Sequence, residues 1–259
     1  MWYLKSLTDG TLGYSFKKEA VVADLIKEKI GATLQITLPA VFLSSALGLL
    51  WGMAAGYYKK TAFDRLSGVF HMVLNAVPSF LLALTLIILL CIRHTWLPYT
   101  GLSSRGVAPG MEGFFMDRLR HLALPVLTIT LGVLPSRYLL MRNAVAAAMD
   151  EKYVLYARQR GLSPFVIRNV YILKNTIQPF LAMLGMSVGL CVGGSLVVEN
   201  IFSIQGMGRL LTDAVYTLDY PLMQGILFVS TGLSTLSLVV TDLLCILLDP
   251  RTRKAAPHE

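Results

Sequence analysis

Five long apolar stretches dominate this sequence and restrict its fold more than any other feature. They are separated by short polar connections and cover Ala32–Tyr58, Leu66–Ile92, Leu122–Met141, Ile177–Val198 and Leu222–Leu248. A bilayer core about 30 Å thick is crossed by about 20 apolar residues in a helix. The sequence therefore predicts an all-α membrane protein, a polytopic helical bundle with five spans.

The composition excludes two other classes of protein. Of the 259 residues, 55% are hydrophobic and 15% are charged, whereas soluble domains average roughly 45–50% and 25%. The net charge of +8 would suit a nucleic-acid binder only if Lys and Arg gathered on one solvated face. Here they lie at the edges of the apolar stretches, as the positive-inside rule predicts. We expect membrane lipid, and no nucleic acid, around the chain.

The distribution of Lys and Arg predicts the orientation. Basic residues cluster between the first two apolar stretches, in a polar segment at Asp150–Lys174 and after Leu248, which places these regions in the cytoplasm. We expect three parts: an external N-terminal segment at 1–30, a transmembrane domain at 31–248 with a cytoplasmic loop at about 142–176, and a cytoplasmic tail at 249–259.

Motifs for chemistry are sparse. Cys91, Cys191 and Cys245 lie inside apolar stretches without CxxC spacing, which favours small core or lipid-facing side chains over a disulfide or zinc site. The sequence contains no HExxH pattern, so a zinc-dependent hydrolase is not supported. It also contains no GxxxxGK[ST] pattern, so any ATPase must be another polypeptide.

The polar segment at Asp150–Lys174 predicts two short helices joined by a turn. Acidic residues at 150–151 suit a helix start, and Arg158 and Arg160 suit its end. Gly161 fits the left-handed position that ends a helix, and Ser163-Pro164 fits a new start, with Ser as N-cap and Pro at the first helical position. The residues alone leave two interpretations open, a docking device for an intracellular motor and an ordinary solvated loop.

A few polar residues lie inside the apolar stretches and are candidates for a translocation path. They are Asn75, Ser79, Ser187 and Asp242. Hydrogen bonds between helices or to the backbone are the alternative role for each of them. Arg137 is expected to extend its charge to the cytoplasmic edge. His71 is a single histidine and does not make a metal site.

Several motifs match a known family. Tyr153, Val154, Ala157, Arg158, Arg160, Gly161, Leu162 and Ser163 have the spacing of the loop pattern YVRTARAKGLS. Further matches are Glu199–Phe202, Gly206–Arg209, Asp219–Pro221 and Leu248–Arg251. In these residues the chain resembles binding-protein-dependent ABC importer permeases of the dipeptide/oligopeptide/nickel group. The broader EAA-x3-G pattern is only partly kept, because Leu155 and Tyr156 replace its first two positions.

The resemblance implies a type I ABC importer permease fold with six spans as the norm, so a span would precede this start or the subunit is shortened. It implies a non-enzymatic transport subunit in the inner membrane of a prokaryote, working with a second permease subunit, two ATPase subunits that bind ATP and Mg, and an external solute-binding protein. No cofactor or metal would bind this chain.

In that picture one set of residues couples transport to the ATPase: Glu151, Tyr153, Ala157, Arg158, Arg160, Gly161, Leu162 and Ser163. The small residues Ala157 and Gly161 would permit close approach of the ATPase. Cargo would be peptides or nickel, and the run Glu199–Phe202 slightly favours nickel or a nickel chelate. The alternative function is an ion-coupled secondary transporter or channel, for which Asp242 is the one intramembrane ionisable candidate.

Overall fold

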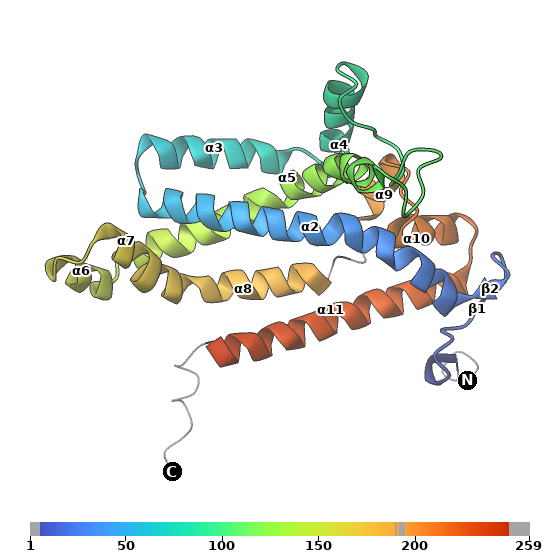
Figure 1. The fold of residues 1–259 in the computed structure, drawn as a ribbon. Coiled ribbons are helices and arrows are strands. Elements are labelled where there is room, and N and C mark those ends of the chain that lie inside the picture. The colour runs from blue at the N-terminus through green and yellow to red at the C-terminus, as the bar shows by residue number, and fades with distance from the viewer. Residues whose placement is uncertain (1–5, 190, 192–194, 249–259) are drawn as a thin grey trace, which may run out of the picture. The chain divides into compact units, whose positions relative to one another are not determined.

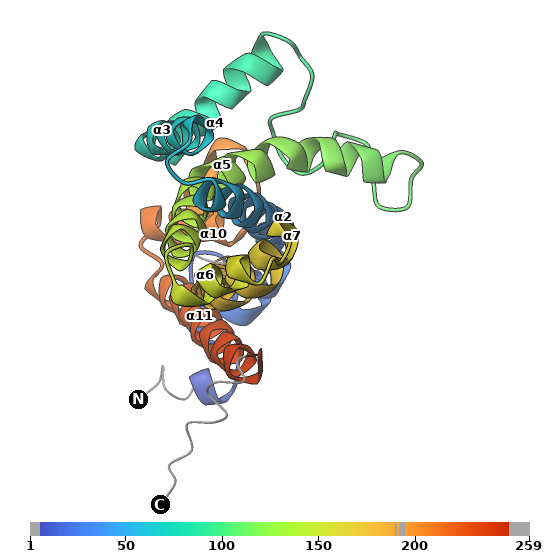
Figure 2. The same cartoon turned by 90° about the vertical axis from the view of Figure 1, so that its left-hand side faces the viewer.

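The computed structural model describes residues 6–189, 191 and 195–248, which are mainly helical (Figures 1 and 2). They form two compact units. Unit 1 comprises Met1–Ala40, Pro78–Ile129 and Val188–Thr235, and unit 2 comprises Val41–Val77, Thr130–Ser187 and Leu236–Glu259. One boundary between the units lies between Val77 and Pro78, and the others fall inside four helices: α2 (Val22–Tyr57), α5 (Phe114–Ala148), α8 (Leu173–Gly189) and α11 (Tyr220–Leu248).

Three described helices are long and apolar enough to cross a membrane: α2, α5 and α11. A fourth span is present if α3 (Ala62–Ala76), α4 (Ser79–Ile87) and the π-helical turn Ile88–Ile92 are counted as one broken span. The described helices therefore depart from the five predicted stretches in two places. The stretch Leu66–Ile92 is interrupted, and Ile177–Val198 is not one helix.

Proline chemistry explains the first interruption. Val77 has extended backbone angles (φ −84°, ψ 118°) and Pro78 precedes α4, because a proline disfavours the helical conformation of the residue before it. In the second place α8 has 17 residues and ends at Gly189. A new helix, α9 (Leu196–Ile201), begins after Ser195, and residues 190 and 192–194 lie outside the described part.

The region expected to be an external segment runs directly into the first span. Strand β1 (Tyr14–Ser15) pairs antiparallel with β2 (Ala20–Val21), and α2 begins at the next residue. The proposed boundary at residue 31 therefore lies inside a continuous helix. The predicted tail at 249–259 lies outside the described residues.

Unit 1 has two apolar clusters. One joins α2, α4, α5 and α9 and contains Ile36, Ala83, Ile87, Cys91, Leu124, Val198, Phe202 and Ile204. The other joins the start of α2, α10 (Met207–Tyr216) and α11, and contains Val22, Ile26, Met207, Leu210, Ala214, Leu222 and Ile226. Cys91 and Cys191 are buried in the core, as predicted; the side chain of Cys245 lies outside the described residues.

Unit 2 depends on close contact between the second half of α2 and α5. Gly48, Gly52 and Gly56 recur every four residues on α2. An added Cβ would lie 2.7 Å from the Tyr138 carbonyl oxygen at Gly52 and 2.5 Å from the Arg142 carbonyl oxygen at Gly56. Small residues at such spacing let membrane helices approach at backbone distance. Any residue with a Cβ atom would therefore collide with α5 at these positions.

We predict opposite effects of alanine at two glycines of α2. Gly52→Ala should lower the stability of the subunit by about 1–3 kcal/mol, because the added methyl overpacks the contact with α5. Gly31→Ala is the matched control, since an added Cβ there meets nothing within 4 Å and alanine favours a helix by about 1 kcal/mol. Thermal unfolding in detergent measures both, and equal shifts for the two variants would contradict this packing.

Candidate functional site

The polar segment forms the predicted helix, turn and second helix. Helix α6 (Lys152–Gln159) follows Glu151, whose backbone is extended. After the C-cap residue Arg160, the chain turns at Gly161, which has φ +73°. The amide of Gly161 donates to the Arg158 carbonyl (2.9 Å), and the amide of Leu162 donates to the Ala157 carbonyl (3.3 Å). This pair of bonds is the Schellman arrangement that satisfies the last carbonyls of a helix. The predicted left-handed glycine is confirmed.

The second helix also begins as predicted. Ser163 accepts a hydrogen bond from the amide of Val166 (3.4 Å), and Pro164 opens α7 (Pro164–Val166). A π-helical segment, Ile167–Ile172, then leads into α8. Helices α6 and α7 lie together at one end of unit 2, at the left of Figure 1 and toward the viewer in Figure 2.

One side of α6 is buried within unit 2. Val154 and Ala157 belong to the apolar cluster that includes Val145 and Ala148 of α5, and Tyr153 and Leu162 pack against it. Ala157 is 2% exposed. Contrary to our expectation, its small side chain does not offer close approach to another protein. It fits α6 against its own unit.

The opposite side of α6 is exposed and partly apolar. Leu155 and Tyr156 are 54% and 60% exposed, and Phe165 on α7 is 67% exposed. Arg158 and Arg160 are exposed beside them. Exposed apolar groups that gather in a patch mark interaction surfaces. We call these five residues the outer face of α6, although Arg160 is the cap residue of that helix and Phe165 lies on α7. The sequence had singled out Leu155 and Tyr156 only as departures from a family pattern.

An ion pair ties the start of this segment to the end of α2. The Nζ of Lys59 lies 2.5 Å from an Asp150 carboxylate oxygen and donates to the Ala146 carbonyl (3.2 Å). The hydrogen bond and positive charge of Lys59 hold the pKa of Asp150 below its usual value. Asp150 therefore stays ionised at neutral pH.

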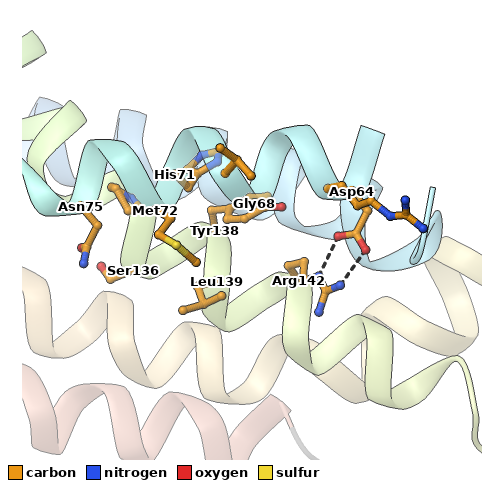
Figure 3. A pocket seen from close by; sticks show the side chains of 12 residues that line it. Asp64, Gly68, His71, Met72, Asn75, Ser136, Tyr138, Leu139 and Arg142 are labelled. Carbon is orange, nitrogen blue, oxygen red and sulfur yellow. Dashed lines mark hydrogen bonds and ion pairs between the residues drawn. The ribbon is translucent and has the colours of Figure 1, made fainter. Parts of the chain in front are cut away.

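Unit 2 also contains a cavity of about 720 Å³ between α3 and α5 (Figure 3). The guanidinium of Arg142 donates two hydrogen bonds to the Asp64 carboxylate (2.8 and 2.6 Å) at one end. Asn75 and Ser136 lie at the other end. Between them the lining is mainly apolar and includes Val69, Met72 and Leu139.

Of the four predicted path residues, only Asn75 lines this cavity. Ser79 is exposed at the start of α4 in unit 1. Ser187 donates to the Met183 carbonyl of its own helix (2.8 Å), and Asp242 is exposed on α11. Within unit 2, Ser187 and Asp242 therefore do not join Asn75 at the cavity.

Arg137 also departs from the prediction. It is 3% exposed and its guanidinium donates to the hydroxyl of Ser44 on α2. It therefore does not extend to the cytoplasmic edge. Its Cβ packs against Gly48, so it belongs to the contact between α2 and α5.

Sequence reasoning missed the role of Glu199 in unit 1. Its fully buried carboxylate accepts hydrogen bonds from the hydroxyls of Thr33 (2.7 Å) and Ser195 (2.6 Å) and from the amide of Arg209 (3.0 Å). An added Cβ at Gly206 would lie 2.5 Å from a Glu199 oxygen. The spacing of Glu199 from Gly206 therefore reflects packing among α2, α9 and α10.

The described residues contain no group of three or more His, Cys, Asp or Glu side chains that could hold a metal ion. The run that slightly favoured nickel in the sequence contains Glu199, whose oxygens are occupied by donors of the protein itself.

Comparisons with known proteins agree with this architecture. Residues 48–254 match the family model "Binding-protein-dependent transport system inner membrane component". A putative peptide permease protein of Brucella suis is 30% identical over 254 residues, which is 97% of this chain and 78% of the relative. The di/tripeptide transport system permease protein of Pseudomonas aeruginosa is 32% identical over 268 residues, covering 97% and 79%.

Among solved structures, an inward-facing form of the MetNI methionine ABC transporter matches with a TM-score of 0.66. It is 16% identical and the match covers 87% of this chain and 96% of that chain, so it supports the fold alone. The fold is that of a type I ABC importer permease, and the chain belongs to the family of binding-protein-dependent transport system inner membrane components.

Proposed function

We propose that this chain is the permease subunit of an ATP-driven, binding-protein-dependent importer of peptides in the inner membrane of a prokaryote. The observation that carries the proposal is α6, a capped helix buried on one side and exposed on the other, in a chain whose family works with partner subunits. The relatives described above are named for peptide transport. The prediction of nickel has no such support.

The family description supports work with partner subunits, and we propose the following set. A second permease subunit completes the pathway, two ATPase subunits bind ATP and Mg, and an external solute-binding protein delivers the cargo. In this proposal the chain supplies no catalytic group and binds no cofactor. It transmits the motion of the ATPase subunits to the membrane helices.

We assign the docking of the ATPase to the outer face of α6. Leu155, Tyr156 and Phe165 supply apolar contact area, and Arg158 and Arg160 supply charge for acidic groups of the ATPase. Glu151, Gly161 and Ser163 set the ends of the helices, while Tyr153, Ala157 and Leu162 hold α6 on the core of unit 2.

The packing of α6 gives it a way to transmit force. Its buried side contacts Val145 and Ala148 of α5 in one close-packed cluster, and close-packed interiors transmit displacement with little compression. The ion pair of Lys59 with Asp150 links the same segment to α2. Closure of the ATPase pair would therefore move α2 and α5 of unit 2 together with α6.

For the translocation path, we propose one residue that has support from the structure. Asn75 has support from the cavity between α3 and α5, and Ser79, Ser187 and Asp242 stay predictions. The alternative of an ion-coupled transporter or channel depends on Asp242, and its exposed position on α11 does not favour that role.

We predict that Gly161→Asp abolishes ATPase coupling without unfolding the subunit. Nothing lies within 4 Å of an added Cβ, and Asp and Asn tolerate a positive φ better than most residues. The added negative charge opposes the acidic groups expected on the ATPase. Gly161→Asn is the neutral control and should keep most of the coupling. ATP hydrolysis stimulated by the binding protein measures it, and normal stimulation with Gly161→Asp would contradict the assignment.

The outer face makes a second prediction. Tyr156→Ala should weaken ATPase binding about tenfold, or about 1.4 kcal/mol, and leave the thermal stability of the subunit nearly unchanged because the side chain is exposed. Val170→Ala, at a residue that is 53% exposed beyond α7, is the matched control. If both variants weakened ATPase binding equally, the assignment of ATPase docking to the outer face of α6 would be contradicted.

Uptake experiments test the cargo. The assembled transporter, with its ATPases and binding protein, should take up di- and tripeptides only with ATP, and a nickel salt should not compete. ATP-dependent uptake of nickel, with no uptake of peptides, would replace peptide by nickel in the proposal.

A further inference from the structure

The cavity between α3 and α5 has the size and lining of a site for a small ligand. Its volume of about 720 Å³ falls within the roughly 300–1,000 Å³ of typical ligand pockets, which combine apolar walls with a few polar groups. Arg65 and Asn75 both line it and are ten residues apart on α3. At 1.5 Å per residue this separation is roughly 15 Å.

One end of the cavity favours an anion. Arg65 is exposed there, and among the described residues its guanidinium makes no hydrogen bond or ion pair. The neighbouring Arg142 is already neutralised by Asp64. The two guanidinium groups of Arg65 and Arg142 thus lie near a single carboxylate, that of Asp64, and this end carries a net positive charge. A carboxylate is a ligand that a guanidinium binds well.

The rest of the lining offers hydrogen bonds to an amide chain. Asn75 is exposed and provides donors and an acceptor. The hydroxyl of Ser136 donates to the Val133 carbonyl (2.8 Å), which leaves its lone pairs as acceptors. The Nδ1 of buried His71 faces the Ser67 carbonyl (2.8 Å) and so carries the proton, and its Nε2 is an acceptor without a partner in the described part of the chain.

We infer that this cavity is a binding site for peptide cargo inside the permease. The C-terminal carboxylate of the peptide lies at Arg65, its backbone amides face Asn75 and Ser136, and its side chains contact Met72 and Leu139. An extended chain advances about 3.5 Å per residue, so the wall accommodates two to four residues. The inference rests on the proposed function, because it assumes that the cargo is a peptide.

The observations favour a peptide over a lipid tail. Polar and ionisable side chains in membrane helices face protein or water-filled cavities, and they avoid acyl chains. The lining contains Asp64, Arg65, His71, Asn75 and Arg142.

Thiol protection in the assembled transporter tests the site. Ser136→Cys should react with a water-soluble alkylating reagent, and a tripeptide at millimolar concentration should slow the reaction at least threefold. The same tripeptide with an amidated C-terminus should protect less, and Arg65→Gln should remove the difference between the two peptides. The chain without Ser136→Cys is the blank, and Thr235→Cys, exposed on α11 outside the cavity, is the control that peptide should not protect.

The contrary outcomes are distinct. Unprotected Ser136→Cys in a transporter that still takes up the tripeptide would overturn the site and leave the proposed function standing. No peptide uptake by the unmodified transporter would overturn the proposed function itself. Protection by a fatty acid but not by peptide would show that the cavity is a lipid groove. No alkylation at all would show that the surface is covered in the assembled transporter. Equal protection by both peptides would overturn the contact with Arg65.

Discussion

The backbone contact of α2 with α5 in unit 2 determines the positions of most groups discussed above. Gly52 and Gly56 lie against the carbonyl oxygens of Tyr138 and Arg142, where a single extra methyl has no room. This contact fixes the register of α5 along α2. It places Arg142 within reach of Asp64 and leaves Val145 free to pack against α6. Both the cavity and the position of α6 therefore depend on glycines that contribute no functional group.

Unit 1 is organised around a buried charge-bearing group. The carboxyl group of Glu199 is removed from water, which is costly unless its oxygens receive hydrogen bonds. Thr33, Ser195 and the amide of Arg209 supply them from three elements. Thr33 also accepts from the amide of Met207 (2.7 Å), the first residue of α10. Thr33 and Ser195 donate to one oxygen of Glu199 and the Arg209 amide donates to the other, so this side chain links α9 and α10 to α2.

Sequence rules for helix caps and turns predicted the segment Asp150–Lys174 well, and they predicted the membrane spans less well. Gly161, Ser163 and Pro164 act through their own backbone, so their positions follow from sequence. The same rules fail where packing decides. Pro39 and Pro179 lie inside α2 and α8, whereas Pro78 separates two helices, although all three interrupt apolar stretches. Which prolines are tolerated depends on neighbouring helices that satisfy the freed carbonyls. The inward orientation of Ala157 and the burial of Arg137 and Glu199 likewise depend on residues far away in the sequence.

The central claim is that the outer face of α6 touches an ATPase subunit, and site-specific cross-linking tests it most directly. Tyr156→Cys and Ala157→Cys are adjacent, but the native side chains are 60% and 2% exposed. A short bifunctional thiol reagent should link Tyr156→Cys to an ATPase subunit carrying a cysteine in its permease-facing groove, with a yield that changes when ATP is added. Ala157→Cys should give no product. Linkage from both positions, or from neither in a transporter that remains active, would contradict the account.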